Sequence, residues 1–171
     1  AILLPTPTDP SCRPTASSNV TINPAPSAAI SVTETSGVAN NDGIICAGAS
    51  ATLTASGGGA YLWSTGATTV GITTGTAGTY TVTVTASGCA ASTSSTIIVN
   101  PLPTPIITVT ETSGVANNDG IICAGASATL TASGGGTYLW STGATTAGIT
   151  TGTAGTYTVT VTNLGCTAST S

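Results

Sequence analysis

One long internal repeat dominates the sequence, and its length limits the folds that the chain can adopt. Residues 31–94 match residues 108–171 at an offset of 77 residues, and only six of the 64 aligned positions differ. A period of this length exceeds that of solenoid repeats and propeller blades, but it suits a small domain with its own core. The sequence therefore predicts two nearly identical domains in tandem.

Each repeat contains short segments in which apolar and polar side chains alternate, which is typical of a β-strand with one buried face. The clearest is 79–85, in which Tyr80, Val82 and Val84 share one face and threonines occupy the other. Turns rich in Gly, Asn and Asp separate these segments, and this combination predicts β-sandwiches. Further strands are expected at residues 30–34, 51–55, 61–63 and 95–100.

We predict an all-β fold of two tandem sandwiches, each with one disulfide, joined by an extended linker. The first domain is assigned to residues 25–101 and the second to residues 102–171, after an N-terminal segment of residues 1–24. The linker, residues 100–105, has the sequence Asn-Pro-Leu-Pro-Thr-Pro. Alternating prolines favour an extended, stiff connection, because each proline fixes its own φ angle.

Five regularly spaced cysteines indicate a disulfide framework and therefore an oxidising, extracellular compartment. A metal site would need closely spaced cysteines or histidine, and the sequence has neither. We predict the pairs Cys46–Cys89 and Cys123–Cys166, because both gaps are 43 residues, although the sequence alone leaves the connectivity open. Cys12 is then left over, as expected of a free thiol or of an intermolecular bond.

The chain carries very little charge, and this excludes several functions. Charged residues make up 4% of the sequence, Arg13 is the only basic residue, and the formal net charge is −4. Binding to nucleic acid is not expected, because it requires several Lys or Arg, and no stretch of about 20 apolar residues predicts a membrane span. Since no His or Lys is present to activate a hydroxyl nucleophile, we predict no enzyme activity and no cofactor.

Several polar features have both a functional and a structural interpretation. Residues 40–43, Asn-Asn-Asp-Gly, offer oxygen ligands for calcium together with Glu34, but two acids per repeat are few for this ion. We therefore interpret them as a hairpin turn and predict no metal site. Tyr61 and Tyr138 are candidates for contact with sugars, with a place in the core as the preferred alternative. Asn19 begins a sequon and is a candidate glycosylation site.

The order Cys46, Trp63, Cys89 matches that of immunoglobulin-like domains, and residues 77–84 resemble the run into strand F with its corner tyrosine. Tyr80, however, lies nine residues before Cys89 rather than two. The disulfide is therefore expected to lie away from the centre of the sandwich.

The whole repeat resembles the Ig-like or PKD-like tandem repeats of Bacteroidota cell-surface adhesins. The matching run is ITVTETSGVANNDGIICAGASATLTASGGGTYLWSTGATT, followed by AGTYTVTV and a closing Gly-Cys, and the resemblance covers about residues 25–171. It implies surface display, long arrays and adhesive or stalk roles. It implies no catalytic residues.

The two ends of the sequence complement each other. Residues 95–101 have no counterpart after Ser171, so the second domain is predicted to lack its last strand. An open sheet edge of this kind can pair with a strand of another chain. The segment that aligns with 95–101 at the same offset consists of Ser18, Asn19, Val20, Thr21, Ile22, Asn23 and Pro24.

These observations predict a subunit of an extracellular filament, at the cell surface or secreted, that assembles head to tail with identical subunits. Residues 18–24 of one subunit would complete the second sandwich of the next, with Val20 and Ile22 filling the pockets of the missing strand. Cys12 would then lie near Cys166 of the neighbour, where it would form an intermolecular link or exchange disulfides, with an unpaired thiol as the alternative. The alternative is a fragment of a longer adhesin stalk that binds glycans or surfaces.

Overall fold

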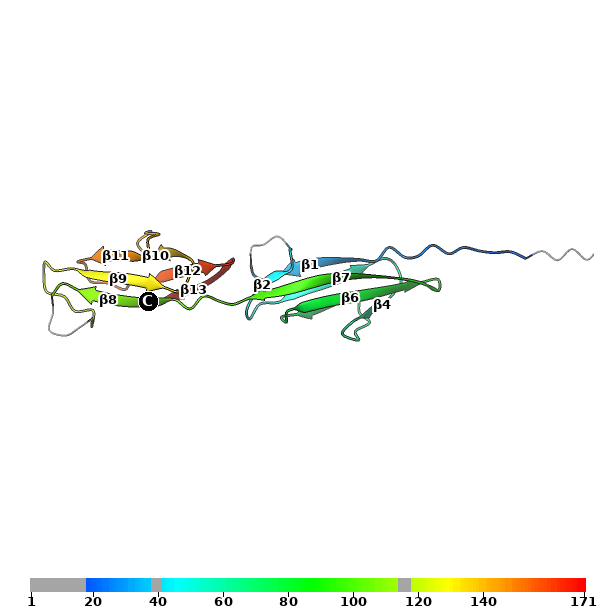
Figure 1. The fold of residues 1–171 in the computed structure, drawn as a ribbon, viewed down its shortest axis with the longest axis horizontal. Helices are drawn as coiled ribbons and strands as arrows, with labels where there is room; N and C mark the ends of the chain where they lie inside the picture. The colour runs from blue at the N-terminus through cyan, green and yellow to red at the C-terminus, as the bar shows by residue number, and fades with distance from the viewer. Residues whose placement is uncertain (1–17, 38–40, 114–117) are drawn as a thin grey trace, which may run out of the picture.

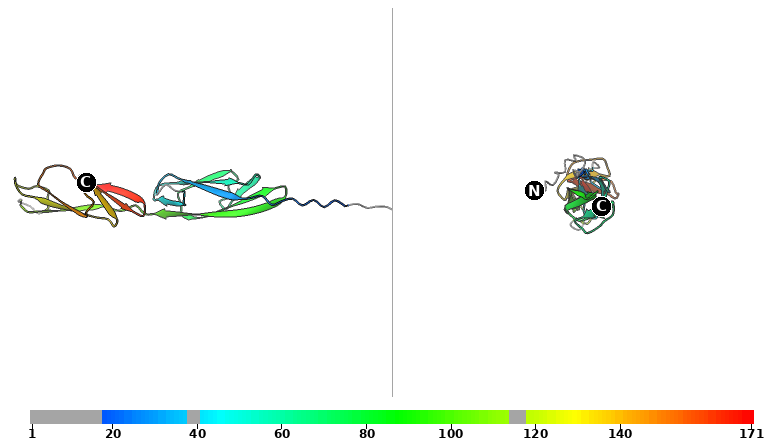
Figure 2. Two further views of the ribbon diagram at one scale, coloured as in Figure 1. Left: turned by 90° about the horizontal axis from the view of Figure 1, so that it is seen from above. Right: turned by 90° about the vertical axis from the view of Figure 1, so that its right-hand side faces the viewer.

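A computed structural model describes residues 18–37, 41–113 and 118–171 of the chain. In these residues the secondary structure is entirely β, in agreement with the sequence, and no helix is present. The strands form two groups that follow each other along the long axis of the molecule, both in Figure 1 and when seen from above in Figure 2. We call the group β1–β7 the first unit and the group β8–β13 the second unit.

The first unit contains two sheets that enclose a common core. One sheet has the order β1-β3-β5 and the other β2-β7-β6-β4. All pairs are antiparallel except β2 with β7, which is parallel. The bounds are β1 Ala29–Glu34, β2 Ile44–Cys46, β3 Ala51–Ser56, β4 Ala60–Trp63, β5 Gly71–Thr74, β6 Gly78–Ala86 and β7 Cys89–Asn100.

The second unit repeats this arrangement with fewer strand residues. Its sheets have the orders β8-β9-β11 and β10-β12-β13, and every pair is antiparallel. Among the described residues no strand corresponds to β2, and the strand equivalent to β7 is shorter. The bounds are β8 Ile106–Glu111, β9 Ala128–Ser133, β10 Thr137–Trp140, β11 Gly148–Thr151, β12 Val159–Asn163 and β13 Cys166–Thr170.

Alternation along the strands builds the cores and also the outer faces. In β3, Ala51, Leu53 and Ala55 are buried while the residues between them are exposed. The outer face of the β6–β7 pair carries a ladder of hydroxyl groups, which wets a surface that has almost no charge. Its hydrogen-bonded pairs are Thr79 with Thr96, Thr81 with Ser94 and Thr83 with Ser92.

The five strands expected from the sequence are all present, within β1, β3, β4, β6 and β7. Two further strands, β2 and β5, and the first half of β7 were not expected. Residues 101–105, which connect the units, contain no regular secondary structure.

The predicted disulfide pairing is wrong, because Cys46 is bonded to Cys166 instead, and the bond therefore joins the two units. The reason lies in the length of β7, which starts at Cys89 and ends at Asn100, the residue beside Cys46. In a strand of twelve residues, the first and last Cα atoms are about 36 Å apart, because each step between neighbouring residues adds about 3.3 Å. Disulfides require Cα atoms less than about 7 Å apart, so Cys46 cannot reach Cys89. The pair Cys123–Cys166 is wrong as well, because Cys166 is bonded to Cys46 and Cys123 is a free thiol. Cys12 lies outside the described residues, and the partner predicted for it, Cys166 of a neighbour, is bonded to Cys46.

Candidate docking groove of the second unit

The main difference between the two units concerns the second half of β7, which is present in the first unit and has no equivalent among the described residues of the second. Residues 95–100 fill the space between β6 and β2, with Ile97 opposite Gly78 and Ile98 opposite Ile44. The Ile97 side chain is 1% exposed and belongs to the core. In the second unit none of the described residues occupies the equivalent place.

The segments on both sides of this place have lost their strand structure, although their sequences are unchanged. Residues 44–46 and 121–123 both read Ile-Ile-Cys, but the first set forms β2 and the second forms no strand. Residues 78–80 and 155–157 both read Gly-Thr-Tyr, but β12 starts only at Val159. The identical sequences thus form strands only in the unit in which residues 95–100 lie between them.

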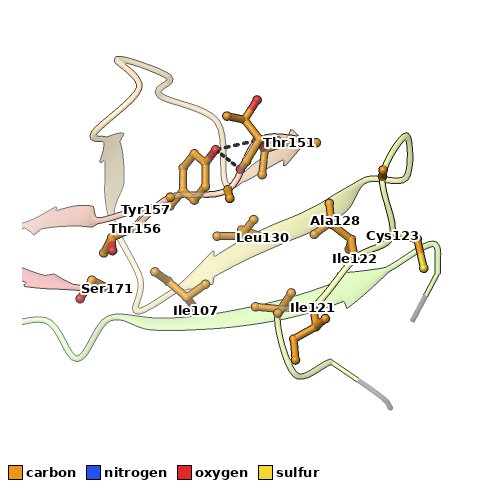
Figure 3. Close-up of a pocket in the computed structure, with 17 residues that line it drawn as sticks. Ile107, Ile121, Ile122, Cys123, Ala128, Leu130, Thr151, Thr156, Tyr157 and Ser171 are labelled. Atoms are coloured by element: carbon orange, nitrogen blue, oxygen red, sulfur yellow. Dashed lines mark hydrogen bonds between the residues drawn. The ribbon is translucent and has the colours of Figure 1, made fainter. Parts of the chain in front are cut away.

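An open groove with an apolar lining marks the site (Figure 3). Its volume is about 680 Å³, and its wall includes core side chains whose equivalents in the first unit are sealed. Leu130 is 8% exposed where Leu53 is 0%, and Ile121 at the rim is 67% exposed. Other residues that line it are Ile107, Ile122, Ala128 and Tyr157. We call this cavity the docking groove.

The wall near β11 is held by Tyr157. Its hydroxyl donates a hydrogen bond to the carbonyl oxygen of Thr153 at 2.9 Å and lies 2.6 Å from Oγ1 of Thr151 (Figure 3). In the first unit, Tyr80 makes the same bonds to Thr76 and Thr74. The groove is thus preformed on this side.

The predicted docking strand lies at the opposite end of the molecule, where residues 18–28 extend from the first unit (Figure 1). Val20 and Ile22 are 87% and 88% exposed, the highest values among the large apolar side chains described. Asn23 is anchored, since its Nδ2 donates to the carbonyl oxygen of Ser87 at 3.0 Å. Its own carbonyl oxygen accepts from Sγ of Cys89 at 3.4 Å.

The contacts of Asn23 repeat those at the joint between the units. Asn100 donates through Nδ2 to the carbonyl oxygen of Leu164 at 3.0 Å, and its carbonyl oxygen lies 4.0 Å from Sγ of Cys166. Asn23 and Asn100 are equivalent in the repeat. The N-terminal segment therefore enters the first unit as the connector enters the second.

The other residues considered from the sequence have structural surroundings. Asp42 accepts a hydrogen bond from the backbone N–H of Ile44 at 2.9 Å, and Glu34 accepts one from that of Gly43, so both carboxylates stabilise this loop. The predicted hairpin is wrong, because β1 and β2 on either side of the loop belong to different sheets and do not pair. Tyr61 and Tyr138 are half-buried and pack against the two cores. Asn40 lies outside the described residues, and Asn19 is exposed.

Within the described ranges, no three His, Cys, Asp or Glu side chains gather in a way that would hold a metal ion. Nor does the described chain contain a helix suited to crossing a membrane. Comparison with known proteins found no matching family model, no matching curated protein and no matching solved structure.

Proposed function

We propose that the protein is a structural subunit of an extracellular filament, assembled when residues 18–24 of one copy occupy the docking groove of another. The observation that carries this proposal is the loss of strand structure at residues 121–123 and 155–157. Both segments match strands of the first unit in sequence, and both border a groove that the described chain leaves empty. The segment that matches the absent strand lies exposed at the other end of the molecule.

We further propose that each unit is an immunoglobulin-like sandwich. The sheet orders β1-β3-β5 and β2-β7-β6-β4 fit this fold. Trp63 is buried beside the inner strands, and the Tyr80 hydroxyl bonds to the backbone four residues upstream, as in a tyrosine corner. The connector of residues 101–105 serves as the short spacer between the two sandwiches.

The register of the docked segment follows from the first unit. Val20 takes the place of Ile97 and lies opposite Gly155, and Ile22 takes the place of Val99 and lies opposite Ile122. Asn19 takes the place of Thr96, whose side chain is exposed on the outer face. A glycan on Asn19 would therefore point into solvent and would not obstruct docking.

Docking buries two apolar side chains that are otherwise in water. Full burial of a Val or Ile side chain contributes about 1.5–3 kcal/mol, and the restored strand pairing adds backbone hydrogen bonds. The cost of ordering the segment is reduced, because Asn23 is already fixed to the first unit. Since the groove and the segment lie on different units, the contact is heterologous and continues from copy to copy.

The segment side is tested with Val20→Asp combined with Ile22→Asp. A buried unpaired carboxylate is strongly unfavourable, so we expect the double variant to remain monomeric under conditions in which the unchanged chain forms filaments. Val70→Asp is the control, because Val70 is exposed and lies outside both docking elements. Electron microscopy and sedimentation give the readout. Filaments of undiminished yield from the double variant would overturn the proposal.

The groove side offers a matched pair of glycines. A Cβ atom on Gly43 would lie 2.4 Å from the carbonyl oxygen of Thr96 in the adjoining strand, whereas one on Gly120, its equivalent, meets nothing within 4 Å. Gly120→Ala should therefore block the incoming segment without a clash inside its own unit. Gly125→Ala is the control, because Gly125 also has a positive φ and open surroundings, as does its equivalent Gly48.

We expect Gly120→Ala to abolish filaments and Gly125→Ala to permit them. Equal assembly by the two variants would contradict the docking model. A chain that stays monomeric in all forms but binds glycans would instead favour the adhesin stalk, in which a further repeat of the same polypeptide fills the groove.

A further inference from the structure

Two cysteine thiols within the described residues take no part in the bond between the units. Cys89 is half-buried at the start of β7, and Cys123 is exposed at the rim of the docking groove. At the offset of the repeat, Cys123 is the equivalent of Cys46 and Cys89 is the equivalent of Cys166. The free pair therefore repeats the bonded pair, but its members lie at opposite ends of the molecule.

The carbonyl group beside the free thiol of Cys89 is equivalent to the one beside its bonded counterpart, Cys166. Sγ of Cys89 lies 3.4 Å from the carbonyl oxygen of Asn23, as Sγ of Cys166 lies 4.0 Å from that of Asn100. Cys89 is presented toward the start of its own unit as Cys166 is presented toward the joint.

Docking supplies the missing half of this arrangement. In the first unit, Cys46 pairs with Asn100 in the parallel β2–β7 ladder, and the backbone N–H of Ala47 donates to Asn100 at 2.8 Å. If a second copy docks in the same register, its Asn23 lies opposite Cys123. Because Asn23 also contacts Cys89 of its own chain, that docked residue brings Cys89 to Cys123.

We propose that Cys123 of one copy forms a disulfide with Cys89 of the copy whose residues 18–24 occupy its docking groove. This inference rests on the proposed function and adds a covalent bond at every joint between subunits. The bonded equivalent, Cys46–Cys166, shows the geometry that the repeat produces at such a joint, with 5.6 Å between the two Cα atoms. All joints along the filament, within and between subunits, would then carry the same bond.

The bond requires an oxidant, because two thiols release two protons and two electrons when they join. A small-molecule disulfide, such as glutathione disulfide, supplies it by exchange. The thiolate of one cysteine attacks this disulfide, forms a mixed disulfide and releases one glutathione thiol. The second cysteine then attacks the protein sulfur of the mixed disulfide and releases the other glutathione thiol.

The test separates this pairing from any other by combining single variants. All chains carry Cys12→Ser, so that the thiol at position 12 cannot contribute, and all are assembled with glutathione disulfide. The parent should give a ladder of multimers on non-reducing electrophoresis that collapses to monomer with reductant. Cys89→Ser alone and Cys123→Ser alone should each give monomer only.

The decisive sample is the mixture of the Cys89→Ser and Cys123→Ser chains. One keeps Cys123 and the other keeps Cys89, so the mixture should give covalent dimers and nothing larger. Dimers from either variant alone would show a bond between like cysteines and would overturn the pairing.

Electron microscopy of the same samples distinguishes the two proposals. Filaments without a ladder would overturn the disulfide and leave strand docking intact. Absence of filaments from the parent would overturn strand docking, and this disulfide with it. We expect filaments of the cysteine variants to dissolve in denaturant alone. Filaments of the parent should dissolve only when reductant is added to the denaturant.

Discussion

At the scale of single residues, one buried tryptophan in each unit ties a loop to the core. The indole N–H of Trp63 donates to the carbonyl oxygen of Thr69 at 2.9 Å, and that of Trp140 donates to Thr146 at the same distance. Both tryptophans are 2% exposed. A buried indole with a satisfied N–H contributes a large apolar surface at no polar cost, and it fixes the turn that follows β4 or β10.

Tyr80 gives a prediction at this scale. Removal of its hydroxyl by Tyr80→Phe leaves the ring in place but breaks the bonds to Thr76 and Thr74. We expect the free energy of unfolding of the first unit to fall by about 1 kcal/mol, as measured by urea titration of tryptophan fluorescence.

Tyr61→Phe is the matched control, because the Tyr61 hydroxyl forms no hydrogen bond with the described part of the chain. Equal effects of the two variants would show that the corner bond contributes nothing.

The cysteines show at the same scale where sequence reasoning stops. Equal gaps of 43 residues favoured the pairs Cys46–Cys89 and Cys123–Cys166, one within each repeat. Which cysteines meet depends on the direction of β2 beside β7 and on the position of the joint. Neither is encoded near Cys46, so the bond to Cys166 could not be derived from spacing.

At the scale of elements, the strands that alternate strongly could be predicted and the others could not. Residues 79–85 alternate over seven positions, and they lie within β6. β2 has only three residues, all apolar, and β5 begins at a glycine, so neither shows a period of two. The first half of β7 is made of small Ala, Ser and Thr residues, which resemble a loop in sequence. The docking groove could be predicted only because alignment of the two repeats shows that residues 95–100 have no counterpart in the second unit.

Strand formation on docking gives a prediction at the element scale. The amide hydrogens of Ile122 and of residues 155–157 should exchange rapidly in the monomer, since these segments lack strand partners. They should become protected in filaments, when the incoming segment pairs with both. The amides of Ile121 and Cys123 are not informative, because they donate to the side chains of Asp119 and Ser113 within the same unit. Residues 44–46 and 78–80, of the same sequence, should be protected in both states and serve as the internal control.

Hydrogen exchange with mass spectrometry resolves these peptides, and the Val20→Asp/Ile22→Asp chain supplies the monomer. Protection of Ile122 and of residues 155–157 in that monomer would mean that the groove is closed by other means. Such a result would contradict docking.

At the scale of the whole molecule, two nearly identical units carry almost no charge. One basic and five acidic residues in 171 leave a net charge of −4. The docking groove is lined by apolar and hydroxyl side chains, and none of its lining residues is charged. Cohesion between subunits should therefore come from apolar burial and backbone pairing rather than from ion pairs.

Ionic strength tests this expectation. The Debye length falls from about 10 Å at 0.1 M salt to about 3 Å at 1 M, which screens most interactions between exposed charges. We expect the concentration needed for filament assembly to rise less than about twofold over this range, because no charged residue lines the groove and no ion pair is therefore lost there on screening. Sedimentation of assembled protein across a sodium chloride series gives the measurement. Dissolution of the filaments at high salt would point to an electrostatic joint.

The strands of both units run close to the long axis of the molecule (Figure 1), and this direction determines how a fibre built from it would bear tension. A docked segment would lie along the direction of pull, between two neighbours that it pairs with on either side. Force would then shear all of its backbone bonds together instead of peeling them apart in succession. Such a junction resists traction well beyond what the same number of bonds would withstand if they opened one by one.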